Sequence, residues 1–484
     1  MRKLTGRASP VPACRPRRRR GCDTELDMAM RRVNLRHRTL VAVGCVLLSS
    51  AGLTACSPGT STQSASSFPG GHGPPTSAQC VQLLGVACYA PKQLRHAYDL
   101  GPLYARGFDG AGRTIVIVEP FGSPTIRHDL ATFDRAFGLP APPSFRILQP
   151  VGAVPPFNRK NAGLLDKAGE TTGDVELAHE IAPGASILLV ETPAPETISG
   201  GGFARFMAAE NYVIAHNLGD VISQSFGLPE PNFGSRSAVL RLRYAFVNAD
   251  RHHVTVLAAS NDFGVTGPAR NDTLYTHPVV NWPASDPLVT GVSGTTLHLT
   301  ASGRRISPDT AWNDSRNAEV IKHFGALPWA AAGGLSAIFT RPAYQDPVSS
   351  TVGDRRGVPD VALSASLSGG VDIFESYTGA PGIWAPGGGT SAATPEFAGL
   401  VAIADQYANK RLGLLNPALY RLEQTGAPGL VNVTSGGNTV TFTQKGKTIT
   451  VRGYRATAGY NLVTGVGTID AALFIPELAD LSRS

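Results

Sequence analysis

The sequence predicts an α/β fold with a central, mostly parallel sheet flanked by helices on both faces. Short apolar runs rich in β-branched residues alternate along the chain with longer segments of helical periodicity, which is the order of parallel strands joined by helical crossovers. These runs are apolar without a polar alternation, which indicates strands buried on both faces. With 42% hydrophobic and 16% charged residues in 484, the chain has enough apolar material for such a core and is not disordered.

The expected elements begin near residue 114. Five short runs rich in Val, Ile and Leu predict buried strands at 114–119, 186–191, 220–225, 254–259 and 288–293. Segments with a repeat of three to four residues predict helices at 125–137, 170–181, 203–217, 237–248 and 396–409. Because no internal repeat and no linker divides this region, we expect one domain over residues 80–484.

Residues 1–55 are expected to be a leader for export. A segment with four arginines between residues 31 and 38 precedes an uncharged stretch too short to span a bilayer comfortably, which ends in Leu53-Thr54-Ala55-Cys56. This order resembles a bacterial lipoprotein signal, in which Cys56 receives the lipid; an ordinary signal peptide and an uncleaved anchor are the alternatives. We divide the leader into an upstream tail (1–27) and a signal peptide (28–55). A flexible tether rich in Ser, Gly and Pro (56–79) follows. The protein is then expected at the outer face of the cell membrane, or secreted.

The net charge of +7 comes from the leader. Residues 1–55 hold 12 of the 43 Lys and Arg but only three of the 36 acidic residues, so the rest of the chain carries a net charge of −2. A nearly neutral body does not predict a nucleic-acid partner, and contact with a membrane is expected only through the lipid anchor. We expect a monomer.

Cysteine usage agrees with export. Cys80 and Cys88 are the only cysteines after Cys56. In an oxidising compartment they are expected to form a disulfide, with two free thiols as the alternative. No cysteine follows residue 88, so a cysteine nucleophile and a Cys-His zinc site in the main domain are excluded.

Ser391 is the first candidate catalytic residue. It stands in Gly387-Gly388-Gly389-Thr390-Ser391, immediately before a predicted helix. The glycines let a substrate backbone approach, and the exposed N–H groups of a helix start can stabilise an oxyanion. The alternative is a glycine-rich loop in which Ser391 only caps the helix.

Three carboxylates could serve a serine nucleophile. Glu170 and Asp174 lie four residues apart and share one helix face with apolar residues that should point inward, whereas Glu176 and Glu180 are expected on the solvated side. Asp262 follows a predicted strand, where ligand sites lie in parallel sheets. The alternative for Glu170 and Asp174 is a partly exposed pair in the first helical turn. The alternative for Asp262 is an aspartate that only forms a turn.

These residues, with ordered motifs such as Ser223-Gln224-Ser225-Phe226-Gly227, Trp282-Pro283-Ala284-Ser285 and Gly459-Tyr460-Asn461-Leu462, resemble the sedolisin family of serine-carboxyl peptidases. The resemblance covers about residues 86–475 and implies a subtilisin-like fold. It implies Ser391 as the nucleophile, Glu170 as general base and acid, Asp174 as the carboxylate that shares its proton, and Asp262 as a protonated oxyanion donor. It also implies a peptide or protein substrate that contacts Ser223, Ser225, Gly227 and Gly389.

The resemblance further implies a calcium (Ca²⁺) site formed by Asn432, Val433, Thr457, Gly459 and Asn461. The family has aspartate where Asn432 and Asn461 stand, and glycine where Thr457 stands. Because the loss of two anionic ligands weakens a site for a hard cation, we expect at most weak calcium binding, with a hydrogen-bonded junction without metal as the alternative.

The leading hypothesis is an exported peptidase that acts at acidic pH, since a carboxylate replaces histidine as the base and Asp262 must be protonated to donate. One alternative is a catalytically silent surface lipoprotein that acts as a binding or scaffold protein. Another is a Ser-His-Asp hydrolase that uses His128, His179 or His216.

Overall fold

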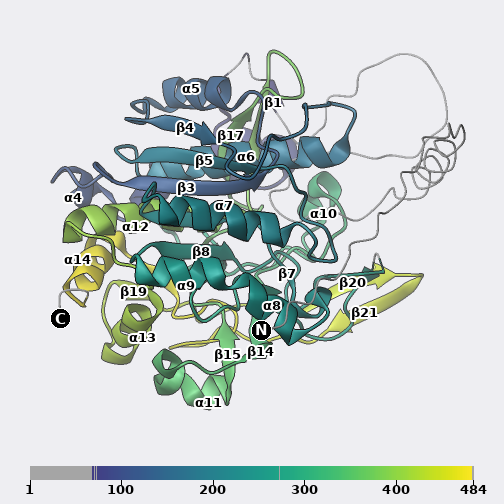
Figure 1. The fold of residues 1–484 in the computed structure, drawn as a ribbon. Helices are drawn as coiled ribbons and strands as arrows, with labels where there is room; N and C mark the ends of the chain where they lie inside the picture. Colours follow the sequence, from purple (N-terminus) through teal and green to yellow (C-terminus); the bar gives the residue numbers. More distant parts are fainter. Residues whose placement is uncertain (1–67, 70, 72, 272, 482–484) are drawn as a thin grey trace, which may run out of the picture. The chain divides into compact units, whose positions relative to one another are not determined.

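The computed structural model describes residues 68–69, 71, 73–271 and 273–481 (Figure 1). The predicted leader, with Cys56, and most of the predicted tether lie outside the described residues. Ordered structure is present within the last part of the predicted tether, where Phe68–Pro69 pairs with a strand of the main domain and a helix begins at Ser77. Among the described helices, none has both the length and the hydrophobicity needed to cross a bilayer.

A mostly parallel sheet of eight strands forms the centre of the fold, which confirms the predicted fold class (Figure 1). Its strands run in the order β13-β12-β8-β6-β3-β5-β4, and β16 pairs with β12 in parallel. Only β13 is antiparallel to its neighbour. The strands of this sheet are β3 (Thr114–Pro120), β4 (Phe145–Leu148), β5 (Ser186–Thr192), β6 (Val221–Gln224), β8 (Thr255–Ala259), β12 (Thr290–Thr296), β13 (Thr310–Ala311) and β16 (Val361–Ser364).

Helices cover both faces of this sheet because successive strand residues point to opposite sides. In β3, Ile115 and Ile117 pack with α6 and α12, whereas Val116 and Val118 pack with α7, which in turn packs on α9. The α-helices are α2 (Ser77–Leu84), α3 (Pro91–Ala97), α4 (Gly101–Tyr104), α5 (Ile126–Phe137), α6 (Ala162–Ile181), α7 (Phe203–Ala215), α8 (Arg236–Leu242), α9 (Tyr244–Arg251), α10 (Ala318–Phe324), α11 (Ser349–Val352), α12 (Thr390–Ala408), α13 (Asn416–Thr425) and α14 (Ala471–Leu481).

A second sheet of four strands, in the order β1-β18-β17-β2, lies against α6 on the side away from the central sheet. The remaining strands form two-stranded pairs, of which β20 and β21 form a hairpin. These strands are β1 (Phe68–Pro69), β2 (Cys88–Tyr89), β7 (Leu228–Pro229), β9 (Pro268–Ala269), β10 (Thr273–Leu274), β11 (Asn281–Trp282), β14 (Gly334–Thr340), β15 (Arg355–Val358), β17 (Gly370–Glu375), β18 (Ile383–Gly387), β19 (Leu430–Val431), β20 (Val440–Gln444), β21 (Lys447–Val451) and β22 (Thr468–Ile469).

The second sheet overturns one sequence prediction about α6. Glu176 and Glu180 were expected on a solvated face, but both are fully buried. The reason is that β17 and α5 cover the outer side of α6, so this helix has no solvated side along its second half. Glu176 Oε2 accepts a hydrogen bond from the backbone N–H of Phe374 in β17, at 2.9 Å.

Three predicted helices differ from the observed ones in extent. The helix predicted over 396–409 begins at Thr390, so Ser391 lies inside its first turn. The helix predicted from Glu170 begins at Ala162, after Asn161, whose side chain accepts hydrogen bonds from the N–H groups of Gly163 and Leu164 and so caps the helix. The helix predicted over 237–248 is two short helices, α8 and α9, that meet at Arg243.

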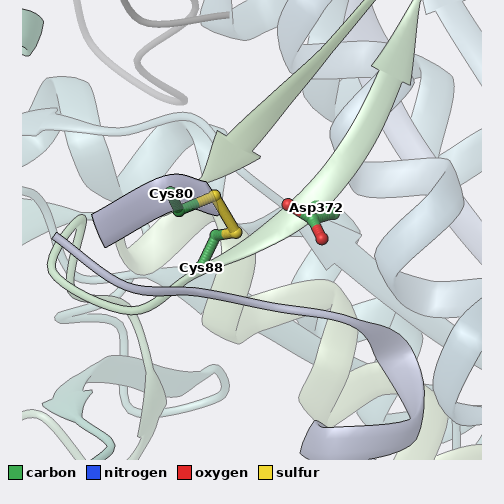
Figure 2. Close-up of side chains that lie close together, drawn as sticks. All are labelled: Cys80, Cys88 and Asp372. Atoms are coloured by element: carbon green, nitrogen blue, oxygen red, sulfur yellow. A yellow bond between two sulfur atoms is a disulfide. The ribbon is translucent and has the colours of Figure 1, made fainter. Parts of the chain in front are cut away.

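A disulfide joins Cys80 in α2 to Cys88 in β2 (Figure 2). The buried carboxylate of Asp372 in β17 lies within 4.8 Å of both sulfur atoms. Because the sulfur atoms are bonded to each other, they offer no thiolate, and this group is not a metal site. The disulfide therefore ties the start of the ordered chain to the second sheet, since β2 pairs with β17.

Candidate active site

Ser391 stands in the first turn of α12, facing a narrow pocket. The pocket is lined by residues that follow β6, by the end of β8 and the residues after it, by the start of β11 and by the start of α12: Ser225, Phe226, Gly227, Ala259, Asn261, Asp262, Asn281, Thr390 and Ser391. Gly389 precedes the helix with a φ of +89°, a left-handed conformation that favours glycine. Ser391 therefore lies where the N–H groups of a helix start are available to an oxyanion.

Asp262 follows β8 and shares this pocket with Ser391. Its Oδ1 accepts hydrogen bonds from Thr390 N at 2.7 Å and from Thr390 Oγ1 at 2.8 Å. Its Oδ2 lies 2.7 Å from the point where a Cβ on Gly389 would be, so any side chain at 389 would displace the carboxyl group. Burial raises the pKa of Asp262 to about 6, although the bonds from Thr390 oppose the shift. Because Oδ1 is an acceptor, Oδ2 is the atom that can carry the proton and donate.

Glu170 and Asp174 lie on α6 with their carboxylates together, and Glu119 at the end of β3 joins them. One oxygen from each of the three lies within 4.8 Å of the others. All three side chains are fully buried. Burial raises the pKa of each, and to about 7 for Asp174. Carboxyl groups this close cannot all ionise, so they share protons and titrate as a unit.

Ser225 connects this carboxyl cluster to the serine helix. Its hydroxyl donates a hydrogen bond to the carbonyl oxygen of Ser391 at 3.3 Å, and its proximity to Asp174 lowers the pKa of that carboxyl group. Neither oxygen of Glu170 has a hydrogen-bond partner. A buried carboxyl group without a partner has the capacity to take and return a proton, which is the task of a general base and acid.

The other predicted substrate-binding residues fall in different places. Ser225 and Gly227 line the pocket, and Gly389 makes room for Asp262. Ser223 does not reach the pocket. It lies within β6, between β3 and β8, and is fully buried, because both edges of this strand are paired in the sheet.

The three histidines of the alternative Ser-His-Asp hypothesis are engaged elsewhere. His179 contacts Pro140 O at 2.9 Å and Asp134 Oδ1 at 3.2 Å. His216 stacks on Tyr212, and His128 packs edge-on against Phe374. Within the described residues, no histidine lines the pocket that holds Ser391.

Three charged residues at the site were missed by the sequence analysis: Glu119, Lys167 and Glu196. Glu119 lies at the carboxyl end of a buried parallel strand, where ligand sites form in such sheets. This position could have predicted it as a residue of the site. Lys167 precedes Glu170 by three residues on the same helix, so its place beside the carboxylates was also readable from spacing. Glu196 comes from the loop after β5, and nothing in its local sequence marks it.

The predicted calcium loop does not fit calcium. Asn461 Oδ1 accepts hydrogen bonds from the N–H groups of Val463 and Thr464, which fixes the orientation of the amide. Its Nδ2 then donates to the carbonyl oxygens of Thr457 at 3.0 Å and Gly459 at 3.4 Å. Asn432 Oδ1 accepts from Gly459 N at 2.6 Å. N–H groups thus bond to four of the oxygens that a cation would need, on Asn432, Thr457, Gly459 and Asn461.

No protein-family model matches the chain. Kumamolisin from Bacillus sp. (strain MN-32) is 32% identical over 80% of this chain and 63% of its own length. Sedolisin from Pseudomonas sp. (strain 101) is 29% identical over 75% of this chain and 57% of its own, and xanthomonalisin from Xanthomonas sp. (strain T-22) is 29% identical over 80% and 46%. The chain therefore spans about half to two thirds of the length of these relatives.

Among solved structures, Pseudomonas sedolisin, a serine-carboxyl proteinase in complex with pseudo-iodotyrostatin, superposes with a TM-score of 0.68 and 26% identity. The match covers 82% of this chain and 99% of that structure. This agreement in fold confirms the subtilisin-like architecture that the motifs imply.

Proposed function

Because this chain is a homologue of the sedolisin family of serine-carboxyl peptidases, we propose that it hydrolyses peptide bonds at acidic pH. The observation that carries the proposal is the convergence of Ser391 and the buried carboxyl of Asp262 on one pocket, with the Glu119, Glu170 and Asp174 carboxyls behind it. The substrates are peptides or proteins.

In the proposed reaction, Ser391 Oγ attacks the carbonyl carbon of the scissile bond while Glu170 accepts the hydroxyl proton. Asp262 Oδ2 donates a hydrogen bond to the oxyanion that develops on the carbonyl oxygen. Glu170 then returns the proton to the leaving amine, and the same groups act in reverse order when water hydrolyses the acyl-enzyme. Asp174 and Glu119 take up part of the charge as Glu170 changes its protonation state.

The pH dependence follows from two opposite requirements. The carboxyl cluster must have lost a proton to act as a base, so activity rises from very low pH as the first proton leaves. Asp262, with a pKa of about 6, must keep its proton to donate, so activity falls as the pH rises through that value. We therefore propose a bell-shaped profile whose alkaline limb reports the loss of the Asp262 proton and whose acid limb reports the carboxyl cluster.

The test is cleavage of a mixed peptide library by the protein across pH 2 to 8, without added calcium, with Ser391→Ala as the control. Cleavage confined to acidic pH and lost in the variant supports the proposal, and the products reveal the specificity. A folded protein that cleaves no peptide at any pH contradicts it and favours a binding or scaffold protein.

A further inference from the structure

Lys167 is a buried cation next to the catalytic carboxyl cluster. Only 6% of the residue is exposed, and it precedes Glu170 by one helical turn on α6. Its Nζ lies 3.6 Å from Asp166 Oδ2 and 3.8 Å from Glu196 Oε2. A buried lysine is costly unless it meets opposite charges, and here acidic groups surround it on α6, on β3 and on the loop after β5.

Glu196 links this lysine to the pocket. It is 7% exposed, and its Oε1 accepts a hydrogen bond from the backbone N–H of Gly227 at 2.8 Å while its Oε2 faces Lys167. Gly227 lines the pocket beside Ser391. Glu196 therefore joins the pocket wall to Lys167, which stands one helical turn before the proposed base, Glu170.

We propose that Lys167 is a positioning residue that keeps one negative charge in the Glu119, Glu170 and Asp174 cluster at acidic pH, and that Glu196 limits this effect as its counter-ion. The proposal rests on the proposed function, because it explains how these carboxyls can supply a base in acid. A cation close to several buried carboxyls favours their ionised form.

The charges around the cluster give the effect its direction. Lys167 lowers the pKa of Glu119, Glu170, Asp174 and Glu196 against the larger upward effect of burial. Asp166 and the neighbouring carboxylates act the other way on Glu170. Tyr377, from the segment after β17, is a further titratable group that interacts with Asp166. Without the lysine, the first ionisation of the cluster would move to higher pH, and the pH window for activity would narrow from the acid side.

The experiment is the pH profile of kcat/KM for a set of variants. Lys167→Met should move the acid limb upward by about one pH unit and leave the alkaline limb in place, since Lys167 acts on the base and Asp262 sets the other limb. Lys167→Arg should restore the limb. Glu196→Gln keeps an acceptor for Gly227 but frees Lys167 from one counter-charge, so it should move the acid limb downward.

Lys322→Met is the matched control, because Lys322 is an exposed lysine paired with Glu319 at 3.1 Å. It should leave both limbs unchanged. The proposal would be overturned by an acid limb that does not move in Lys167→Met. It would also be overturned by acid limbs that move in the same direction in Lys167→Met and Glu196→Gln. If Lys167→Met does not fold, Glu196→Gln decides alone, since a purely structural role does not predict a downward shift.

A second readout separates this proposal from the peptidase assignment. Burial raises the folded-state pKa of the four carboxyls, so each costs stability as the pH rises above its unfolded value, and Lys167 reduces that cost. The drop in Tm caused by Lys167→Met should therefore be larger at pH 7 than at pH 3. That result would support the electrostatic role even in a protein that cleaves nothing, whereas an equal drop at both pH values would contradict it.

Discussion

At the scale of single residues, the two oxygens of Asp262 have separate tasks. Oδ1 is held by the N–H and hydroxyl of Thr390, and Oδ2 lies against Gly389 at the pocket. An asparagine at position 262 could therefore perform both tasks. Its Oδ1 can accept the two hydrogen bonds from Thr390, and its Nδ2 can donate a hydrogen bond at every pH.

We therefore predict that Asp262→Asn loses the alkaline limb near pH 6 and retains activity toward neutral pH. The expected reason is that an amide does not lose a proton as the pH rises through the pKa of the original carboxyl. The measurement is kcat/KM from pH 3 to 8. Asp262→Ala, which removes the donor, should lower kcat about 100-fold to 1,000-fold at all pH values. An alkaline limb that stays at the same pH in Asp262→Asn would assign that limb to another group.

At the scale of elements, the side-chain amide of Asn461 closes the loop from Thr457 to Thr464 by hydrogen bonds at both of its polar atoms. We predict that EDTA leaves the Tm of the protein unchanged. Asn461→Asp should be less stable by about 1–3 kcal/mol, because an acceptor would then face the carbonyl oxygens of Thr457 and Gly459.

Calcium gives this variant a specific test. The new carboxylate and the two carbonyl groups form an oxygen-rich site, so millimolar Ca²⁺ should restore part of the lost Tm of Asn461→Asp. Asn461→Ala is the control, which loses the bonds of Nδ2 and of Oδ1, offers no carboxylate, and should not respond to Ca²⁺. A wild-type protein that loses stability in EDTA would show that this loop, or another one, holds a metal.

The second half of α6 carries a further pH dependence. Burial raises the pKa of Glu180 to about 8, and neither of its carboxylate oxygens has a hydrogen-bond partner. Because this folded-state pKa lies above the unfolded value, Glu180 costs stability as the pH rises from about 4.5 toward 8. Glu180→Gln should then raise the unfolding free energy by about 3 kcal/mol at pH 7 and have little effect at pH 3. Thermal or urea unfolding at both pH values measures this, and an equal change at both would refute the titration.

The sequence of α6 predicts which residues face the central sheet, but it does not predict what covers the other side of the helix. The spacing of Glu170 and Asp174 correctly placed both on an inward face, because that face also carries apolar residues. The same periodicity assigned Glu176 and Glu180 to solvent, since nothing local reveals that a second sheet covers the other side. Glu196 could not be found for the same reason, as it reaches Gly227 only through the tertiary fold.

At the scale of the whole molecule, the described domain begins close behind the segment that we propose to be an export signal. Its first described elements are tied to the second sheet by the Cys80–Cys88 disulfide and by the pairing of β1 with β18. Such a disulfide fits an oxidising compartment, which agrees with export. A domain fixed in this way would stand off a membrane at the end of the residues that follow Cys56.

We predict that lipid attachment at Cys56 holds the protein at the membrane. Cys56→Ser should move the exported protein from the membrane fraction to the soluble fraction, because the protein then lacks the acyl chains that supply membrane affinity. Cys45→Ser is the matched control, since Cys45 lies in the apolar stretch of the same leader and should not be needed for the anchor. The measurement is detergent phase partitioning of the full chain expressed in a bacterial host that processes lipoproteins. A Cys56→Ser protein that stays with the membrane and keeps its leader would instead identify an uncleaved anchor, and a wild-type protein found only in the medium would identify an ordinary signal peptide.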